Sequence, residues 1–500
     1  MSKQMNIVFA GAAGEGIETA GKITAKVLHD LGYHTFFIPE YMSRIKGGCN
    51  SSLVKVSEDF APYFEKRIDV LFAINKCAVE HLRARVSEGT RIIELPGSTG
   101  NFWAIGAALK MFGVGLELTR ELIGEILNAK NNLEQLEAGY GLEIERAEVA
   151  AGDAGGQFIS GNDATALGCL GGGCNFIAFY PMSPSTTLST FMCGQDDMVA
   201  EQVEDEICAI NMALGASYAG ARAMVSTSGG GFALMCEGVS LTGMIELPVV
   251  IHLAQRPAPA TGLPTRDAQE DLNLALYAGH GEFPRIILSP STLQNSYEIG
   301  AKAFNLADKF QVPVFILTQQ SFLESEFGTE EFGETPEITS ERAIPNSGED
   351  LVCVDSDEHD EQARITEDFE TRRKMHEKRL AKLDLIKEEL ENDSAGFEFS
   401  GGADADLIIS WGGNYHIIQA ALQGRASFSH LHIIQLHPLQ KRIFEYIKDA
   451  KTVSIIEQNA TGQLGVLLGI SPYKKLLKYT GEPLALEDIE EWLKEFSGEF

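Results

Sequence analysis

The sequence lacks the closely spaced cysteine pairs that hold zinc ions or iron–sulfur clusters. It has eight cysteines and none of them stands at C-x-x-C spacing. We therefore expect no metal centre in this chain. Scattered cysteines in a cytoplasmic protein are expected to be reduced and buried as small hydrophobic residues. The eight are Cys49, Cys77, Cys169, Cys174, Cys193, Cys208, Cys236 and Cys353.

Positive charge and long apolar runs are also scarce. The chain has 40 basic against 71 acidic residues and a net charge of −31. Such a charge repels nucleic acids and anionic membrane surfaces, so neither is an expected partner. No apolar run approaches the ~18 residues needed to span a bilayer. The first ten residues lack the basic region and cleavage site of an export signal, which predicts a cytoplasmic protein.

The composition that remains is that of a multidomain α/β protein. With 500 residues, 44% of them hydrophobic, and 50 glycines, the chain has the length of roughly three or four domains. Alanine and glycine dominate residues 148–156, and the strand–helix alternation stops over residues 324–405, where a charged segment (361–391) predicts an exposed helix. We therefore expect four segments: 1–150, 157–330, 331–403 and 404–500.

Apolar runs alternate with helical segments along most of the chain. In the first segment a strand at 7–10, a helix to Leu31 and a strand at 35–38 predict a βαβ unit and a parallel sheet. The alternation in the second segment predicts a doubly wound sheet. Its expected strands are 176–179, 223–226, 248–253, 285–288 and 312–317, and those of the last segment are 407–410, 432–435 and 452–456.

A glycine turn, Gly11-x-x-Gly14-x-Gly16, stands where the first strand enters its helix. Backbone amides at such a helix start can hold a phosphate. The glycine order differs from the G-x-G-x-x-G fingerprint of dinucleotide-binding folds, but Glu40 stands where the ribose-binding acid of those folds would be. A structural turn and a dinucleotide site of a nicotinamide-linked oxidoreductase both fit this pattern.

Three further positions follow expected strands of the second segment. Ser183 belongs to Y-P-M-S-P-S-T (180–186), which two prolines stiffen, and Arg256 follows the strand at 249–254. Ligands bind at the carboxyl ends of such strands, and an arginine there can clamp a carboxylate. The turn at 226–231 is rich in glycine, which permits close approach of a ligand to the backbone. For Ser183 and Arg256, a structural turn and a surface arginine fit the local pattern as well.

Four carboxylates precede or open the next helix, which ends near Ala219. Carboxylates at a helix start favourably meet the positive end of the helix dipole. The local pattern therefore predicts that all four are solvated partners of that dipole. They are Glu201, Glu204, Asp205 and Glu206.

Taken together and in order, these motifs resemble the 2-oxoacid:ferredoxin oxidoreductases, in the form with a gamma domain fused ahead of the alpha domains. The segment Y-P-M-S-P-S-T is similar to the family's Y-P-I-T-P-S-[ST], and residues 44–48 (R-I-K-G-G) to the R-G-G segment of its gamma domain. The similar blocks are 11–17, 39–48, 180–186, 204–209, 226–231, 255–266 and 457–463.

The resemblance implies a gamma-type domain over 1–150, a pyrimidine-binding thiamine-diphosphate domain over 157–330, a linker over 331–403 and a transketolase-like domain over 404–500. It implies thiamine diphosphate at the junction with a beta subunit that carries Mg²⁺ and a [4Fe-4S] cluster, in a dimer of heterodimers. Consistent with this division, residues 152–154 (G-D-A) lack the third glycine of a diphosphate-binding G-D-G.

The implied reaction converts a 2-oxo acid and CoA to acyl-CoA and CO2 and reduces ferredoxin. In it Glu206 would hydrogen-bond the aminopyrimidine ring, and Ser228 and Gly229 would contact the cofactor. The expected substrate-binding residues are Ser183, Arg256 and Arg266. The fused arrangement makes 2-oxoglutarate the first choice and branched-chain 2-oxo acids the second. The acidic surface predicts that ferredoxin docks on the partner subunit.

Three departures from the family pattern leave substrate preference open. Ser183 replaces a threonine and loses the methyl group that restrains the rotamer. Gly230 replaces the proline of T-S-G-P-G, and residues 257–260 (P-A-P-A) replace G-G-P-S. The non-enzyme alternative for the whole chain is a degenerate alpha-like subunit that acts as a scaffold.

Overall fold

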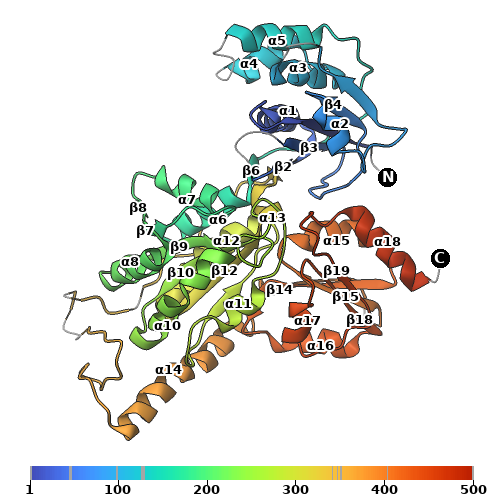
Figure 1. The fold of residues 1–500 in the computed structure, drawn as a ribbon. Coiled ribbons are helices and arrows are strands. Elements are labelled where there is room, and N and C mark those ends of the chain that lie inside the picture. The colour runs from blue at the N-terminus through green and yellow to red at the C-terminus, as the bar shows by residue number, and fades with distance from the viewer. Residues whose placement is uncertain are drawn as a thin grey trace. The chain divides into compact units, whose positions relative to one another are not determined.

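A computed structural model describes residues 3–43, 48–96, 100–124, 130–340, 342–345, 347–348, 352–402 and 404–497. The chain divides into two compact units, and Figure 1 labels their helices and strands. Unit 1 comprises Met1–Ser160, Glu324–Glu331 and Leu484–Phe500, and unit 2 comprises Gly161–Leu323 and Phe332–Pro483. In the ranges described, no helix combines the length and apolar character needed to cross a membrane.

Unit 1 is built on a mixed sheet, in the order β5-β4-β1-β3-β2-β13-β6. The expected parallel sheet was wrong: β3 lies between β1 and β2 and runs antiparallel to both, so that Val54 pairs with Ile7 on one side and Phe37 on the other. Nearly every residue of β3 is buried, which favours a central place with a partner on each side. The first strands are β1 (Gln4–Ala12), β2 (His34–Glu40), β3 (Cys49–Ser57), β4 (Val70–Ala73) and β5 (Arg91–Glu94).

Two distant segments complete unit 1. Strand β13 (Glu326–Thr329) pairs antiparallel with β2 and with β6 (Gln157–Ser160). Helix α18 (Leu486–Ser497) begins beside residue 66, where the backbone amides of Lys66 and Arg67 donate to the Glu487 carboxylate. The remaining helices are α1 (Ile17–Asp30), α2 (Cys77–His81), α3 (Asn101–Met111), α4 (Leu116–Leu122) and α5 (Lys130–Tyr140).

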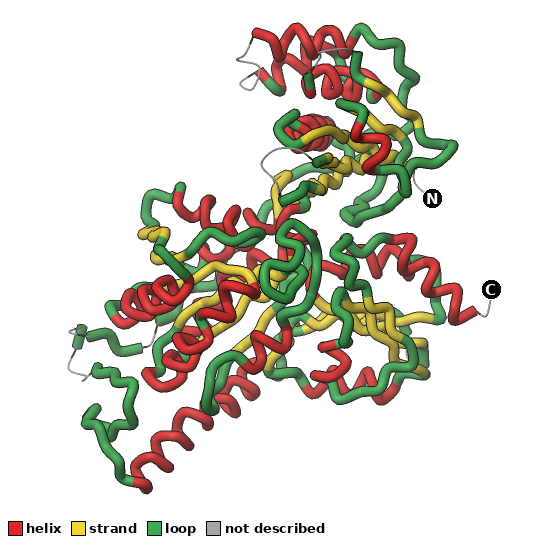
Figure 2. Tube along the Cα trace, viewed as in Figure 1, coloured by secondary structure: helices red, strands yellow, loops and turns green. Residues whose placement is uncertain are grey.

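Unit 2 contains the doubly wound sheet that the sequence predicts, in the order β17-β11-β12-β10-β9-β7-β8. All its neighbouring pairs are parallel except β11 with β17. Strands β10 and β12 are buried along their whole length, as expected of strands covered on both faces, and Figure 2 shows helices flanking this sheet. Its strands are β7 (Phe176–Phe179), β8 (Val199–Gln202), β9 (Ala223–Ser228), β10 (Val249–Gln255), β11 (Ile286–Leu288), β12 (Pro313–Gln319) and β17 (Gln435–His437).

The path of the chain creates a switch point in this sheet. From β7 the chain steps outward to β8 and then returns across β7 to β9, which puts the loops after β7 and β9 on either side of the reversal. Open α/β sheets bind ligands at such a point. The helices of this part are α6 (Gly161–Gly171), α7 (Thr186–Cys193), α8 (Glu206–Tyr218), α9 (Gly229–Leu234), α10 (Cys236–Ile245), α11 (Leu272–Tyr277), α12 (Leu293–Phe310) and α13 (Gln320–Glu324).

A second sheet of unit 2 has the order β14-β16-β15-β18-β19. It shares one hydrophobic core with the first sheet, since Trp411 and Ile433 belong to the same buried cluster as Val225 of β9 and Ile251 of β10. The charged segment expected as a helix contains α14 (Phe369–Leu390). The remaining elements are β14 (Phe397–Ser400), β15 (Asp406–Trp411), α15 (Tyr415–Leu422), β16 (Phe428–Ile433), α16 (Lys441–Asp449), β18 (Thr452–Glu457), α17 (Gln463–Leu467) and β19 (Lys475–Leu477).

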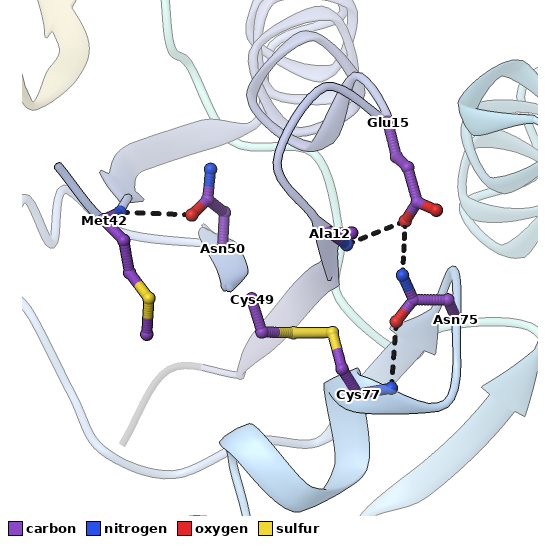
Figure 3. Close-up of a disulfide and its surroundings, with 7 residues drawn as sticks. All are labelled: Ala12, Glu15, Met42, Cys49, Asn50, Asn75 and Cys77. Carbon is purple, nitrogen blue, oxygen red and sulfur yellow. Dashed lines mark hydrogen bonds between the residues drawn. A yellow bond between two sulfur atoms is a disulfide. The ribbon is translucent and has the colours of Figure 1, made fainter. Parts of the chain in front are cut away.

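The expectation that every cysteine is reduced and buried was wrong. Cys49, at the start of β3, and Cys77, at the start of α2, form a disulfide (Figure 3). The two positions are 28 residues apart in sequence and are brought together by the sheet, so no local spacing reveals the pair. Cys193 and Cys353 are exposed, whereas Cys169 and Cys174 are buried as expected.

Candidate functional site

Loops from three neighbouring strands of unit 2 meet at the carboxyl edge of the sheet. Ser183 follows β7, Ser228 ends β9, and Arg256 follows β10. Arg256 Nη1 donates a hydrogen bond to the Ser183 carbonyl oxygen at 2.8 Å, so the loop after β7 and the end of β10 are in direct contact. Burial lowers the pKa of Arg256, and attraction by Asp271 partly offsets that effect. The structure therefore brings together two of the predicted substrate-binding residues.

Glu206 differs from the other acids near the start of α8. Glu201 lies in β8 and Glu204 precedes the helix, and both are exposed, whereas the Glu206 side chain is buried, with 3% of its surface exposed. Asp205 is the N-cap, and its carboxylate accepts from Cys208 N at 2.7 Å. The prediction of four solvated dipole partners was thus wrong for Glu206, because the first helical position of α8 turns toward the sheet.

The buried Glu206 carboxyl group lacks a complete set of partners. Its Oε1 atom has no hydrogen-bond partner among the described residues, and the same is true of the buried Ser228 Oγ. A buried acceptor without a hydrogen bond costs about 1 to 3 kcal/mol, more for a charged group, so such atoms need an explanation. A ligand that offers a donor at this edge of the sheet would supply the missing bond to Glu206.

The glycine turn at the start of α9 makes room for this carboxyl group. A Cβ atom on Gly231 would lie 2.5 Å from Glu206 Oε1 and would also overlap Thr227, whereas a Cβ on Gly230 meets only the Ala260 carbonyl oxygen, at 3.7 Å. The turn is therefore closed at Gly231 and open at Gly230. The family proline that Gly230 replaces would stand at this open position, in the first turn of a helix, where proline is tolerated.

This difference gives a matched pair of substitutions. Gly231→Ala is expected to push the Glu206 carboxyl group out of place and to lower ~10-fold or more the turnover that the family resemblance implies, the scale of a small misplacement of a reacting group. Gly230→Ala places its methyl group in open space and is expected to keep turnover within ~2-fold of wild type. Steady-state assays of both variants, with circular dichroism to confirm folding, test this. Equal activities would show that Gly231 does not set the position of Glu206.

A second buried acid, Asp271, was not predicted from the sequence as a site residue. It precedes α11, has 5% of its surface exposed, and its Oδ2 atom has no hydrogen-bond partner among the described residues. A Cβ on Gly229 would lie 2.5 Å from Asp271 Oδ1, so the carboxyl group packs on the glycine turn. Burial and, to a lesser degree, Glu270 raise the pKa of Asp271 to about 7, against the attraction of Arg256. In the sequence it is only an acid before an apolar helix, which is an ordinary capping pattern.

The segment from Arg256 to Asp271 is anchored by a buried polar network. The Asp267 carboxylate accepts from Ser321 N and Oγ, both at 2.8 Å, and from Gln319 and Gln458. Gln458 belongs to the motif at 457–463, which thus supports this segment from the second sheet. Arg266, the third expected substrate residue, lies within the segment, and a Cβ on Gly481 would lie 3.3 Å from its Cβ atom. No described contact joins it to Arg256.

The glycine turn of unit 1 is already occupied by a side chain of the protein. The Glu15 carboxylate accepts from Ala12 N and from Asn75 Nδ2, each at 2.7 Å (Figure 3). Glu40 accepts from Ser51 and forms an ion pair with Arg85 at 2.8 Å. A carboxylate where a phosphate would bind, and an engaged Glu40, both disfavour the dinucleotide alternative. Residues 44–47 of the R-G-G segment lie outside the described ranges.

Comparison with known proteins finds similarity along most of the chain. Residues 167–378 match a family described as pyruvate flavodoxin/ferredoxin oxidoreductase, thiamine-diphosphate-binding, and residues 6–97 match pyruvate ferredoxin/flavodoxin oxidoreductase. A 2-oxoacid:ferredoxin oxidoreductase subunit alpha from Sulfolobus is 26% identical over 98% of this chain and 96% of that protein. A 2-oxoacid:ferredoxin oxidoreductase 1, subunit alpha from Aeropyrum pernix is 32% identical over 75% of this chain and 65% of that protein. The chain belongs to the 2-oxoacid:ferredoxin oxidoreductase family.

Two relatives of this family carry 2-oxoglutarate in their names. A 2-oxoglutarate synthase subunit from Methanothermobacter thermautotrophicus is 43% identical over 32% of this chain and 43% of its own length. The structure of a 2-oxoglutarate:ferredoxin oxidoreductase from Magnetococcus marinus, with 2-oxoglutarate, coenzyme A and succinyl-CoA bound, superposes with a TM-score of 0.86. The two chains are 26% identical, and the match covers 99% of this chain and 100% of that one.

The residues of this 2-oxoacid:ferredoxin oxidoreductase fit the aminopyrimidine part of thiamine diphosphate. Glu206 Oε1 and Ser228 Oγ are buried polar atoms without hydrogen-bond partners among the described residues, and the missing side chain of Gly231 lets the Glu206 carboxyl group pack against the turn. A ring with an amino group and ring nitrogens supplies both donors and acceptors. Across the described part of the chain there is no group of three or more acidic, histidine or cysteine side chains arranged for a metal ion.

Proposed function

We propose that the chain is the gamma–alpha fused subunit of a thiamine-diphosphate-dependent oxidoreductase that acts with a beta subunit in the cytoplasm. The proposed reaction is 2-oxo acid plus CoA plus two oxidised ferredoxins giving acyl-CoA, CO2 and two reduced ferredoxins, with 2-oxoglutarate as the substrate. The observation that carries the proposal is the buried, unpartnered Glu206 carboxyl group at the same sheet edge as Arg256. The names of the 2-oxoglutarate relatives support the choice of substrate.

In this proposal Glu206 holds a proton between its Oε1 atom and a ring nitrogen of the aminopyrimidine. Burial strengthens this hydrogen bond because no water competes for the carboxyl group. Ser228 would accept or donate a further bond, and Gly229 would let the ring approach the backbone. When bound, thiamine diphosphate supplies the electron sink for the negative charge left by loss of CO2.

Arg256 would bind the carboxylate next to the scissile carbon–carbon bond. A guanidinium group can hold a carboxylate through two parallel hydrogen bonds, and one edge of Arg256 already fixes the Ser183 loop. The Ser183 hydroxyl would bind the oxo or carboxylate oxygen. Arg266, farther along the same segment, would meet the distal part of the substrate, which in 2-oxoglutarate is a second carboxylate.

A substrate panel on the co-purified complex tests the proposed function. Reduction of a viologen dye, measured with 2-oxoglutarate, pyruvate and a branched-chain 2-oxo acid in the presence and absence of CoA, should be fastest with 2-oxoglutarate. Release of bound cofactor by acid should yield thiamine diphosphate and no dinucleotide. A complex that reduces no dye with any 2-oxo acid would indicate the scaffold alternative.

The division of labour between subunits gives a separate prediction. We place Mg²⁺ and the [4Fe-4S] cluster in the beta subunit, within a dimer of heterodimers in which ferredoxin docks on beta. The chain expressed alone is therefore expected to contain no iron and to bind thiamine diphosphate at least ~100-fold more weakly than the complex, because most of the charged diphosphate contacts are missing. Metal analysis and calorimetric titration of both preparations measure this. Stoichiometric iron in the isolated chain would contradict it.

A further inference from the structure

Asp271 is a buried acid at the end of the segment that runs from Arg256 to Asp271. Its backbone amide donates to Gln255 Oε1 at 3.0 Å, and Gln255 immediately precedes Arg256. Its carboxyl group packs on Gly229, in the glycine turn. Asp271 is therefore fixed from two sides, by the end of β10 and by the start of α9. The Asp271 Oδ2 atom is buried and has no hydrogen-bond partner among the described residues.

Two charged groups act on this carboxyl group. Arg256 attracts it, and Glu270 repels it. Glu270 is half-buried and is held in the same segment by the Ala258 amide, which donates to its Oε2 atom at 2.7 Å. Gln463 of α17, which packs against this turn, contributes neutral hydrogen bonds to the Asn273 amide and the Glu270 carbonyl oxygen. Burial and the repulsion by Glu270 outweigh the attraction by Arg256, which is the positively charged group that acts on Asp271 at this edge of the sheet.

We propose that Asp271 is a positioning residue that acts as the counter-ion of Arg256 in the free enzyme and takes up a proton when a substrate carboxylate binds to Arg256. This inference rests on the proposed role of Arg256. A carboxylate arriving at the guanidinium group places a second negative charge beside a buried one that has little other compensation. Two carboxylates that share one site do not both stay charged, so a proton from solvent moves onto Asp271.

The proposal has two measurable consequences. Binding of a 2-oxo acid near neutral pH should be accompanied by net proton uptake, because about half of the Asp271 side chains carry a charge when the pKa is about 7. The KM for the 2-oxo acid should also rise with pH. If one proton with a pKa near 7 must be taken up, KM should increase about 10-fold between pH 6 and pH 8.

Asp271→Asn keeps the size of the side chain and removes the charge, and Asp271→Ser, which leaves room for water, serves as a second variant. Glu270→Gln is the matched control, since it removes the same charge from the neighbouring residue, whose side chain accepts a hydrogen bond from the Ala258 amide. The complex is titrated calorimetrically with N-oxalylglycine, an unreactive analogue of 2-oxoglutarate, in two buffers of different ionisation enthalpy. The pH dependence of KM and kcat for 2-oxoglutarate is measured in parallel.

Wild type is expected to take up protons on binding and to show the rise in KM. Glu270→Gln should keep both, with its KM profile moved to lower pH because one repulsive charge is gone. Both Asp271 variants should lose the proton uptake and show a KM that changes less than ~2-fold over the same range. Proton uptake that persists in the Asp271 variants, or that is lost in Glu270→Gln, would overturn the proposal. Binding without proton uptake in wild type overturns it alone, whereas absence of binding overturns the proposed function as well.

Discussion

Replacing Glu206 by glutamine is expected to slow turnover of the assembled complex about 100-fold or more, the usual scale for one positioned acid–base group. The amide fills the same buried space beside Gly231 but cannot hold a transferable proton. Folding, assembly with the beta subunit and most of the cofactor affinity should remain. Turnover in the dye-reduction assay, together with the rate of deuterium exchange at the reactive carbon of bound thiamine diphosphate, measures the effect.

Glu204→Gln is the control for this experiment. Glu204 lies two residues earlier, outside the helix and exposed, so loss of its charge should change turnover less than ~2-fold. Both substitutions remove one negative charge near the start of α8, so an effect on the helix dipole would be similar in the two. Equal, mild effects would show that the acidic cluster only complements the dipole, and the catalytic role of Glu206 would have to be withdrawn.

The contrast between Glu206 and Glu204 also shows what the local sequence hides. Four acids near one helix start look alike in the sequence, because burial depends on which helical position faces the sheet. Glu206 was singled out by its place in a family motif, whereas the dipole pattern alone predicted a solvated side chain. Asp271 had no comparable signal, since Gly229, on which it packs, and Arg256, which attracts it, follow strands β9 and β10 and are about 40 and 15 residues away in sequence.

The fold was predictable where burial is uniform and less so where pairing is long-range. The strands of the doubly wound sheet, such as β7 and β10, are apolar runs between helices, which is the pattern that parallel buried strands produce. In unit 1 the same reasoning gave β1, α1 and β2 but missed β3, which lies between β1 and β2 and makes the sheet mixed. Strand β13 has four residues and pairs with strands encoded far upstream, and so short a segment has no periodicity from which to predict it.

Arg256→Ala is expected to weaken the use of every 2-oxo acid. Loss of one partner of a charge-assisted pair costs about 2 to 4 kcal/mol of transition-state stabilisation, or roughly 30- to 1,000-fold in kcat/KM. The carboxylate next to the scissile bond is common to all 2-oxo acids, so pyruvate and 2-oxoglutarate should lose similar factors. Steady-state kinetics with both substrates measure this, with Arg425→Ala, which removes an exposed arginine, as a control for lost positive charge.

Arg256→Lys separates the charge from its geometry. Lysine keeps a positive charge but cannot hold a carboxylate through two parallel hydrogen bonds while also reaching the Ser183 carbonyl oxygen, so its kcat/KM should fall between those of wild type and Arg256→Ala. If Arg256→Ala changed only the preference among substrates and left the best kcat/KM intact, the guanidinium group would belong to the side-chain pocket. In that case another residue would have to bind the reacting carboxylate, and the hydrogen bond from Arg256 to Ser183 would serve only to hold the loop after β7.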